Sequence, residues 1–376
     1  MLNQSKPQND REILKISDLT VTFHTYAGEV KALNGVELSV KKSELLGLVG
    51  ESGCGKSVTS LSIVGLLPQN AEVVSGKVLL NGVNLLTMGE EEIRKARLKD
   101  VAIVFQDPLT YLNPVLTIGS QITEIIAADP EIFLSRLLEY RLDEIAQAET
   151  KGRIDAKLVS EKERLISALK TGKLNPNEIK HLARDYVLSI LRSVRLPDPD
   201  KVLRSYPFEL SGGMRQRAMI AMALLRRPKI LLADEMTTAL DVTVQAQILQ
   251  LLKELRNEID ASVILITHDL AVVAEVCDRV AVMYAGNVVE VADVEELYRN
   301  PLHPYTRGLL ASIPRVDTSI DEQTSIGGSV PNLIYPPSGC RFNPRCPKAF
   351  AKCPQEKPTL IEVSPGHLVS CFLYED

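Results

Sequence analysis

The stretch GESGCGKS, residues 50–57, has the residue types and spacing of a phosphate-binding loop. Its three glycines allow backbone N–H groups to gather around anionic oxygens at the start of a helix, where the helix dipole favours negative charge. Lys56 can reach the outer phosphates of a nucleotide, and the hydroxyl of Ser57 can ligate magnesium. An apolar run precedes the loop and a helical pattern follows it, which a chance glycine-rich turn would not explain. The residues expected to bind the nucleotide are Gly50, Ser52, Gly53, Cys54, Gly55, Lys56, Ser57 and Val58.

A second candidate segment is KILLADE, residues 229–235, an apolar run that ends in two carboxylates. Beside a phosphate loop, Asp234 is suited to an outer contact with magnesium, and Glu235 to orienting or deprotonating an attacking water. An apolar run followed by Asp-Glu is common and means little alone. The segment becomes a candidate site only because the chain also has a phosphate-binding loop with Lys56.

A third candidate is LSGGMRQR, residues 210–217, in which Ser211, Gly212 and Gly213 can open a helix with bare N–H groups. In isolation this is an ordinary serine cap followed by two flexible glycines. Since the chain already has one phosphate loop, a second anion-binding helix start makes sense if it completes the site of another subunit.

These motifs, in this order, resemble those of the ATP-binding cassette (ABC) family. LSGGMRQR is similar to the family's signature motif, DEMTTALD (234–241) contains its D-loop, and ITHD (266–269) carries its switch histidine. The resemblance implies an α/β P-loop NTPase cassette: a RecA-like parallel sheet core with an antiparallel β subdomain and a helical subdomain. It also implies ATP hydrolysis, with Mg²⁺, at a dimer interface.

The resemblance implies roles for single residues. Tyr26 is similar to the aromatic residue that stacks on adenine, although an ordinary loop tyrosine would look the same. Gln106 resembles the glutamine that touches magnesium and the attacking water, and the segment after it resembles the contact with a transmembrane partner. Asp241 resembles the D-loop residue that crosses the dimer interface, and His268 the residue that holds the terminal phosphate and the water.

Two positions depart from the family's pattern. Val58 stands where many cassettes have Thr, so one hydroxyl contact to phosphate is lost while the backbone N–H remains. Met236 replaces the proline that usually follows the catalytic Glu, so the turn is less rigidly fixed. Neither departure removes an essential group, and we expect an active site.

Within the family, four stretches resemble the ATPase subunits of oligopeptide and dipeptide importers: FQDPLTYLNPVLTIGSQI, YPFELSGGMRQR, TALDVTVQAQIL and HPYTRGLLASIP. The resemblance covers residues 12–128 and 184–374. It implies a related second ATPase subunit, two transmembrane permease subunits and an extracytoplasmic solute-binding protein, with the chain at the cytoplasmic face of the membrane. The solute cannot be read from the chain: peptides, oligosaccharides and metal chelates all remain open, as does a homodimer.

The segment CRFNPRCPKAFAKC, residues 340–353, is rich in thiols. Spacing leaves a metal site and unrelated loop cysteines equally open, since it fits neither a zinc knuckle nor a ferredoxin run. The family resemblance implies a 4Fe–4S cluster on Cys340, Cys346, Cys353 and Cys371. We expect the cluster to stabilise the loop-rich C-terminal segment, which would lie apart from the residues that hydrolyse ATP. The alternative is a redox-sensing role.

The pattern of the rest of the chain indicates the elements that position these residues. Alternation predicts strands over 13–23 and 30–40 and a hairpin about Asn81-Gly82, and apolar runs predict parallel strands at 45–49, 230–233 and 263–266. Residues 12–300 are therefore assigned to the nucleotide-binding domain and 301–376 to a C-terminal domain rich in Pro, Gly and Cys. Residues 129–182 read as a helical insertion that could dock a partner or be a solvent-facing decoration. Asp129-Pro130 and Asn175-Pro176 can each start a helix, and Gly172 can end a helix in which Leu158, Leu165 and Leu169 share a face.

Composition narrows the function classes. The 376 residues are 45% hydrophobic with a net charge of −5, so no basic field indicates a nucleic-acid partner. No apolar run is long enough to span a membrane. The competing interpretations are a cassette ATPase that acts on DNA or the ribosome, and a cassette ATPase for efflux.

Overall fold

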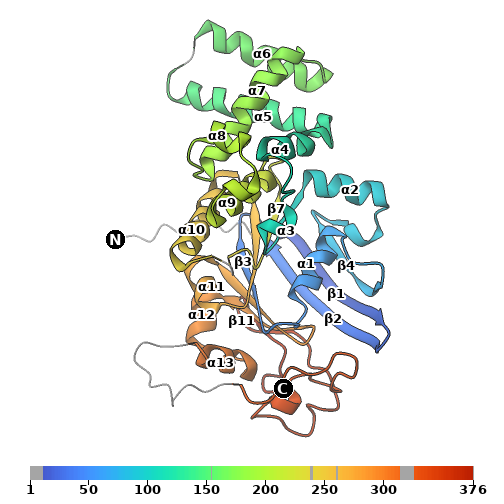
Figure 1. The fold of residues 1–376 in the computed structure, drawn as a ribbon. Helices are drawn as coiled ribbons and strands as arrows, with labels where there is room; N and C mark the ends of the chain where they lie inside the picture. The colour runs from blue at the N-terminus through green and yellow to red at the C-terminus, as the bar shows by residue number, and fades with distance from the viewer. Residues whose placement is uncertain (1–11, 154, 238–239, 260, 314–325, 376) are drawn as a thin grey trace. The chain divides into compact units, whose positions relative to one another are not determined.

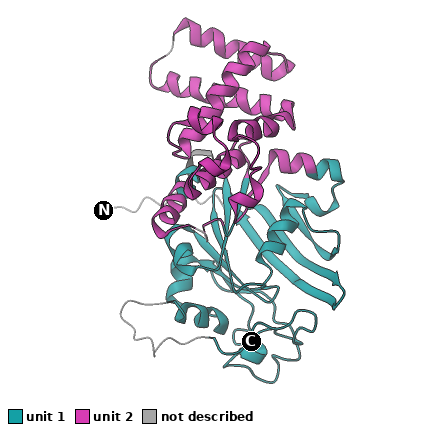
Figure 2. Ribbon diagram, in the orientation of Figure 1, with its two compact units in different colours: residues 1–93, 230–235, 252–376 teal, residues 94–229, 236–251 magenta. Residues whose placement is uncertain are grey.

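The computed structural model describes residues 12–153, 155–237, 240–259, 261–313 and 326–375. The chain divides into two compact units, which are described one at a time below (Figure 2). Unit 1 comprises Met1–Ile93, Ile230–Glu235 and Leu252–Asp376, and unit 2 comprises Arg94–Lys229 and Met236–Leu251. The C-terminal segment, expected as a domain of its own, thus belongs to the same compact unit as the phosphate loop.

Unit 1 contains an antiparallel sheet in the order β2-β1-β4-β5 (Figure 1). Its strands are β1 (Glu12–Thr25), β2 (Gly28–Lys41), β4 (Ala71–Leu80) and β5 (Val83–Asn84). The predicted hairpin forms because Asn81 and Gly82 both take positive φ angles, 49° and 83°, as a two-residue turn of this kind requires. The expected antiparallel β subdomain is confirmed.

The second sheet of unit 1 has the strand order β11-β12-β10-β9-β3-β8-β7. Strands β3, β7, β8 and β9 run parallel to one another, and every residue of β3 and β8 is buried. Unbroken apolar runs form such strands because both faces of a parallel sheet are covered. The strands are β3 (Leu45–Val49), β7 (Ile230–Asp234), β8 (Ser262–Thr267), β9 (Arg279–Tyr284), β10 (Asn287–Asp293), β11 (Ile361–Ser364) and β12 (His367–Val369).

Short helices accompany these sheets. Helix α1 follows the phosphate loop as expected. Its Val64 is buried, whereas Val58 and Leu61 are half-buried. The helical segments are α1 (Lys56–Val64), η1 (Leu85–Thr87), α11 (Leu270–Val276), α12 (Val294–Arg299), α13 (Pro304–Ala311) and η4 (Asn343–Arg345). Helix α2 (Glu90–Lys99) begins in unit 1, but its residues from Arg94 onward belong to unit 2.

The C-terminal segment is loop-rich, as expected, but it also extends the second sheet, which the sequence did not indicate. Strand β12 pairs antiparallel with β10, so that Glu290 faces Val369. The carboxylate of Glu290 is fully buried and accepts N–H groups from Leu302 and His303, at 2.6 and 2.9 Å, and contacts the Nε2 atom of His367 at 2.8 Å. One buried carboxylate therefore joins β10, the start of α13 and β12.

Unit 2 is mostly helical, as expected for the helical subdomain. Its elements are β6 (Val101–Val104), α3 (Pro108–Tyr111), α4 (Ile118–Ala127), α5 (Pro130–Thr150), α6 (Ala156–Thr171), α7 (Pro176–Ser193), α8 (Pro199–Arg204), η2 (Pro207–Glu209), α9 (Gly212–Leu224) and the larger part of α10 (Val242–Ile259). Among the described residues, no helix has the length and apolar content needed to cross a bilayer.

The predicted insertion forms helices where its capping residues indicate. The side chains of Asp129 and Asn175 cap α5 and α7, and Gly172 ends α6 with a φ of 67°. A small apolar core of Leu138, Ile145, Leu165 and Ala168 joins α5 to α6. Leu169, expected on this inner face, is instead exposed. The third helix runs to Ser193, beyond the expected boundary at residue 182.

Acid pH should destabilise the fold around the buried carboxylate of Glu290, where His303 lies. Burial lowers the pKa of His303 to about 4, from 6.5, against the opposing charge of Glu290. Between pH 4 and pH 6.5, His303 binds a proton in the unfolded chain but not in the folded one. Its contribution to the free energy of unfolding is therefore fully present above pH 6.5 and is lost as the pH falls toward 4. Atom Nδ1 of His303 accepts the N–H of Tyr305 at 3.1 Å and caps α13, and the amide oxygen of an asparagine can take over this role. We therefore expect the unfolding free energy of His303→Asn to rise by about 3 kcal/mol relative to that of wild type as the pH is lowered from 7 to 4.

Urea unfolding at several pH values measures this difference. The matched control is His181→Asn, at an exposed position of α7. A difference between wild type and His303→Asn that stays constant from pH 7 to pH 4 would contradict the prediction.

Candidate nucleotide site

The phosphate loop connects β3 to α1, and two of its three glycines are required by close contacts. Gly50, Gly53 and Gly55 have φ angles of 152°, 77° and 108°. A Cβ atom on Gly50 would lie 2.2 Å from the carbonyl oxygen of Met283, and one on Gly55 would lie 2.7 Å from the side chain of Leu33. The loop can therefore follow this path only with glycine at positions 50 and 55, whereas at Gly53 a Cβ atom would meet nothing within 4 Å and only the positive φ favours glycine.

The other loop residues differ in exposure. Ser52 is exposed at the tip of the loop, and Val58 is half-buried at the start of α1. Cys54 is buried, and burial raises the pKa of its thiol. Its carbonyl oxygen accepts the N–H of Gly286, at 2.8 Å, from the turn between β9 and β10. Cys54 thus links the loop to the turn between β9 and β10, and its expected contact with the nucleotide remains a prediction.

Lys56 lies at the centre of the loop. Its side chain is buried, and the ammonium group donates to the carbonyl oxygens of Gly50 and Glu51, at 2.8 and 3.2 Å. The loop therefore curls around a fixed positive charge. This charge and the N–H groups at the start of α1 are what the phosphates of a nucleotide require.

Two oxygen groups beside the loop fit a magnesium ion. The hydroxyl of Ser57 donates to Oδ1 of Asp234 at 3.5 Å, at the end of β7. Burial raises the pKa of Asp234, while the contact with Ser57 opposes the shift. Hard oxygen ligands with further places left for phosphate oxygens are the donor set that Mg²⁺ prefers.

The expected base and the switch histidine lie side by side in unit 1. Atom Nδ1 of His268 is 3.5 Å from Oε1 of Glu235. Glu235 has a φ of 44°, and its N–H donates to the carbonyl of Ile266 at 2.9 Å, which fixes the turn after β7 against β8. Because β7 and β8 are parallel neighbours, the residues that follow them meet at the same edge of the sheet.

In unit 2 the signature segment opens α9 as expected. Oγ of Ser211 accepts the N–H of Met214 at 3.3 Å and caps the helix. A Cβ atom on Gly213 would lie 2.8 Å from Cγ1 of Val244 in α10, whereas one on Gly212 would lie 3.7 Å from Leu240. The second glycine is therefore required by helix packing, a reason that the sequence did not reveal.

The remaining candidate residues are all exposed. Asp241 caps α10 through Oδ1, which accepts the N–H of Val244 at 2.9 Å. Gln106 follows β6 in unit 2, and Tyr26 occupies the turn between β1 and β2 in unit 1. Their proposed contacts with nucleotide or partner remain predictions.

Comparison with known families decides the class of protein. Residues 33–238 match the ABC transporter family, and residues 289–353 match the C-terminal region of oligopeptide/dipeptide transporters. The chain belongs to the ABC transporter family. As a cassette of this family it is an ATPase, and the expected P-loop NTPase fold, with its parallel core, antiparallel β subdomain and helical subdomain, is confirmed.

Several curated proteins resemble this ABC cassette over nearly its whole length. The dipeptide transport ATP-binding protein DppD of Bacillus subtilis is 44% identical over 365 residues, which cover 97% of this chain and 95% of DppD. The oligopeptide transport ATP-binding protein OppD of Escherichia coli is 41% identical over 360 residues, which cover 96% of this chain and 93% of OppD.

Solved cassettes share the fold. The dimeric bacterial ABC transporter cassette MJ0796 superposes with a TM-score of 0.54 and 25% identity, covering 75% of this chain and 98% of MJ0796. The same protein is known in a post-hydrolysis state with ADP and Pi. The cassette cbiO1 of Clostridium perfringens gives a TM-score of 0.55 at 25% identity, covering 77% and 92% of the two chains.

The prediction of a 4Fe–4S cluster on Cys340, Cys346, Cys353 and Cys371 is wrong. The four thiols line one narrow cavity with Phe342, Phe350 and Phe372. However, no three His, Cys, Asp or Glu side chains in the described part of the chain form a group that could hold a metal. Burial raises the pKa of Cys340 to about 11 and also raises those of Cys346 and Cys371.

The sequence did not indicate a role for Glu51 of the phosphate loop, or for the two residues that contact it, Arg345 and Tyr305. Glu51 occupies a variable position of the loop motif, and Arg345 lies between Cys340 and Cys346 in the C-terminal segment. Tyr305 belongs to HPYT, which was used only as a family marker. An arginine and a buried tyrosine gave no local signal, because their partners lie far away in the sequence.

Proposed function

We propose that this ABC cassette is the ATP-hydrolysing subunit of an importer for oligopeptides or dipeptides. The observation that carries the proposal is the match of residues 289–353 to the C-terminal region of oligopeptide/dipeptide transporters. Relatives named as dipeptide and oligopeptide transport proteins, more than 40% identical over nearly the whole chain, support it.

In the proposed reaction, the chain's own residues position and polarise the phosphates. Lys56 and the N–H groups of the loop bind the phosphate oxygens, and Ser57 and Asp234, with Gln106, would hold Mg²⁺. When bound, Mg²⁺ neutralises charge on the phosphates. Glu235 orients and deprotonates the attacking water, and His268 holds the terminal phosphate, while Tyr26 stacks on adenine.

The proposed site is completed by a second subunit. Ser211, Gly212 and Gly213 of one cassette would bind the terminal phosphate held by the loop of the other, with Asp241 at the interface. The proposal includes a related but different second ATPase, two transmembrane permease subunits and an extracytoplasmic solute-binding protein. The chain would then lie on the cytoplasmic face of the membrane, peripherally attached to the permeases.

Reconstitution tests the proposal. Proteoliposomes would contain the cassette, its second ATPase and the permease pair, with purified solute-binding protein outside and ATP inside. We expect uptake of a radiolabelled dipeptide or pentapeptide that requires both ATP and the binding protein, and no uptake when the cassette carries Glu235→Gln.

Three results would contradict it. Outward movement of the peptide would indicate efflux. Uptake of a labelled oligosaccharide or metal chelate, without peptide uptake, would contradict the substrate class. Recovery of the cassette from detergent-solubilised membranes with nucleic acid, and without integral membrane proteins, would contradict transport altogether.

A further inference from the structure

The C-terminal segment contacts the phosphate loop directly, contrary to the expectation that it lies apart from ATP hydrolysis. The guanidinium of Arg345 donates to both carboxylate oxygens of Glu51, with Nη1–Oε2 and Nη2–Oε1 distances of 2.9 and 3.1 Å. The side chain of Arg345 is 7% exposed and that of Glu51 is 24% exposed. A bidentate ion pair of this kind, largely shielded from water, fixes the orientation of both side chains.

Further contacts hold Arg345 in place. Its Nε donates to the carbonyl of Gly327 at 2.9 Å, and Nη1 also reaches the hydroxyl of Tyr284 at 3.3 Å. The guanidinium lies 5.6 Å from the centre of the Tyr284 ring. The hydrogen bonds to Glu51 raise the pKa of Arg345, so it remains charged. The arginine is therefore a rigid link between the cysteine-containing segment and the loop.

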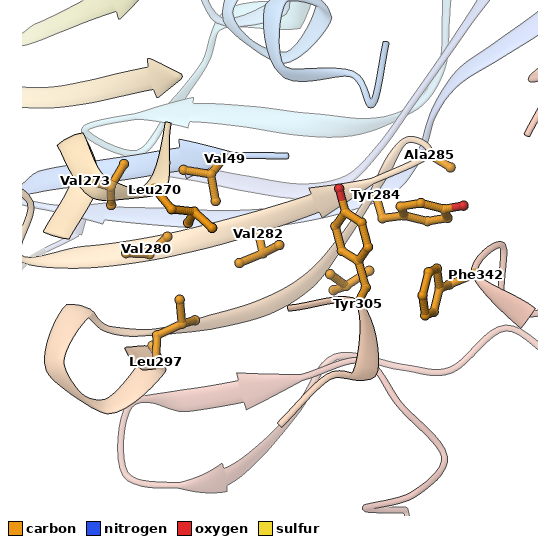
Figure 3. Close-up of a cluster of buried hydrophobic side chains, with 12 residues drawn as sticks. Val49, Leu270, Val273, Val280, Val282, Tyr284, Ala285, Leu297, Tyr305 and Phe342 are labelled. Atoms are coloured by element: carbon orange, nitrogen blue, oxygen red, sulfur yellow. The ribbon is translucent and has the colours of Figure 1, made fainter. Parts of the chain in front are cut away.

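A second contact fixes the backbone of the same loop residue. The N–H of Glu51 donates to the hydroxyl of Tyr305 at 3.0 Å. Tyr305, Tyr284 and Phe342 pack with ring centroids 4.6 to 5.4 Å apart, and Figure 3 shows the three rings gathered next to Ala285. The aromatic cluster thus fixes the peptide between Gly50 and Glu51. The carbonyl oxygens of these two residues accept hydrogen bonds from the ammonium of Lys56.

The pair has an electrostatic consequence. Glu51 places a negative charge within a loop whose task is to bind phosphates, and an uncompensated carboxylate there would repel them. Arg345 supplies the compensating charge from a position 294 residues away in the sequence. Affinity for the nucleotide should therefore depend on the C-terminal segment.

We propose that Arg345 is a positioning residue for ATP binding, which neutralises Glu51 and, together with Tyr305, fixes the start of the phosphate loop. The inference rests on the proposed nucleotide site and adds the C-terminal segment to it. Arg345 acts through Glu51 and does not itself contact the phosphates.

Binding of MgATP to the purified full chain, measured by calorimetry, tests the proposal together with steady-state KM and kcat. We expect Arg345→Ala to weaken binding about tenfold and to raise KM similarly with little change in kcat, because it leaves Glu51 unpaired beside the phosphates. Glu51→Gln should bind within about threefold of wild type. The double variant, which carries both Arg345→Ala and Glu51→Gln, should bind MgATP as well as Glu51→Gln does, because no uncompensated charge remains.

Two further variants make the test decisive. Arg345→Lys keeps the charge and should bind better than Arg345→Ala, even if the alanine variant folds poorly. Lys352→Ala removes ion pairs with Glu356 and Glu375, at 3.9 and 3.5 Å, from the same segment and should leave binding unchanged.

The contrary outcomes are distinct from one another. Wild-type affinity in Arg345→Ala, or a double variant as weak as Arg345→Ala, would overturn the role of charge compensation while leaving the nucleotide site intact. Absence of MgATP binding to the wild type would overturn the nucleotide site and this inference with it.

Discussion

Replacing Glu235 with Gln is expected to lower the turnover number for ATP hydrolysis roughly 10²- to 10⁴-fold while leaving ATP binding intact. The side chain lies at the end of β7, 3.5 Å from His268, with its backbone fixed to β8. The substitution keeps the shape and the hydrogen-bonding capacity of the side chain, but it removes the group that accepts a proton from water. Phosphate release in the assembled complex measures turnover, and calorimetry with MgATP measures binding.

The matched control is Glu275→Gln, the same chemical change at an exposed position of α11. It should turn over ATP at the wild-type rate. Near wild-type turnover in Glu235→Gln would remove Glu235 from the role of general base.

Replacing Lys56 with Ala is expected to weaken MgATP binding roughly 30- to 100-fold. The variant loses charge-assisted hydrogen bonds to phosphate oxygens, each about 1.5 to 3 kcal/mol. It also leaves the carbonyls of Gly50 and Glu51 without the ammonium that they bind at 2.8 and 3.2 Å. Calorimetry on the purified chain measures the affinity, and thermal unfolding without nucleotide separates loss of binding from loss of folding.

Lys15→Ala provides the control for Lys56, since it removes a lysine of β1 whose ion pair with Glu12, at 3.5 Å, is about half exposed. Its affinity for MgATP should equal that of the wild type. Tight MgATP binding by Lys56→Ala would contradict the assignment of the loop as the phosphate site.

The two experiments separate binding from chemistry. Lys56 acts on the bound phosphates throughout the reaction, whereas Glu235 acts on the water at the moment of attack. Loss of hydrolysis with retained binding in one variant, and loss of binding in the other, is the pattern that a phosphoryl-transfer site requires.

Local sequence patterns were enough to predict the phosphate loop, the buried strands that lead to the site and the caps of the inserted helices. Each of these depends on a few contiguous residues: the glycines before Lys56, the apolar run before Asp234, and the Asp129-Pro130 start of α5. Their spacing carries the information because strands and helices repeat over short distances, and because local backbone geometry allows few alternatives.

Contacts between distant segments, by contrast, are visible only in the folded chain. It paired Glu51 with Arg345, buried Glu290 among residues of three elements, and explained Gly213 by its contact with α10. It also showed that the four clustered cysteines do not form a metal-binding group among the described residues. Such contacts depend on where the folded chain brings remote residues together, and the spacing of residues along the sequence does not record this.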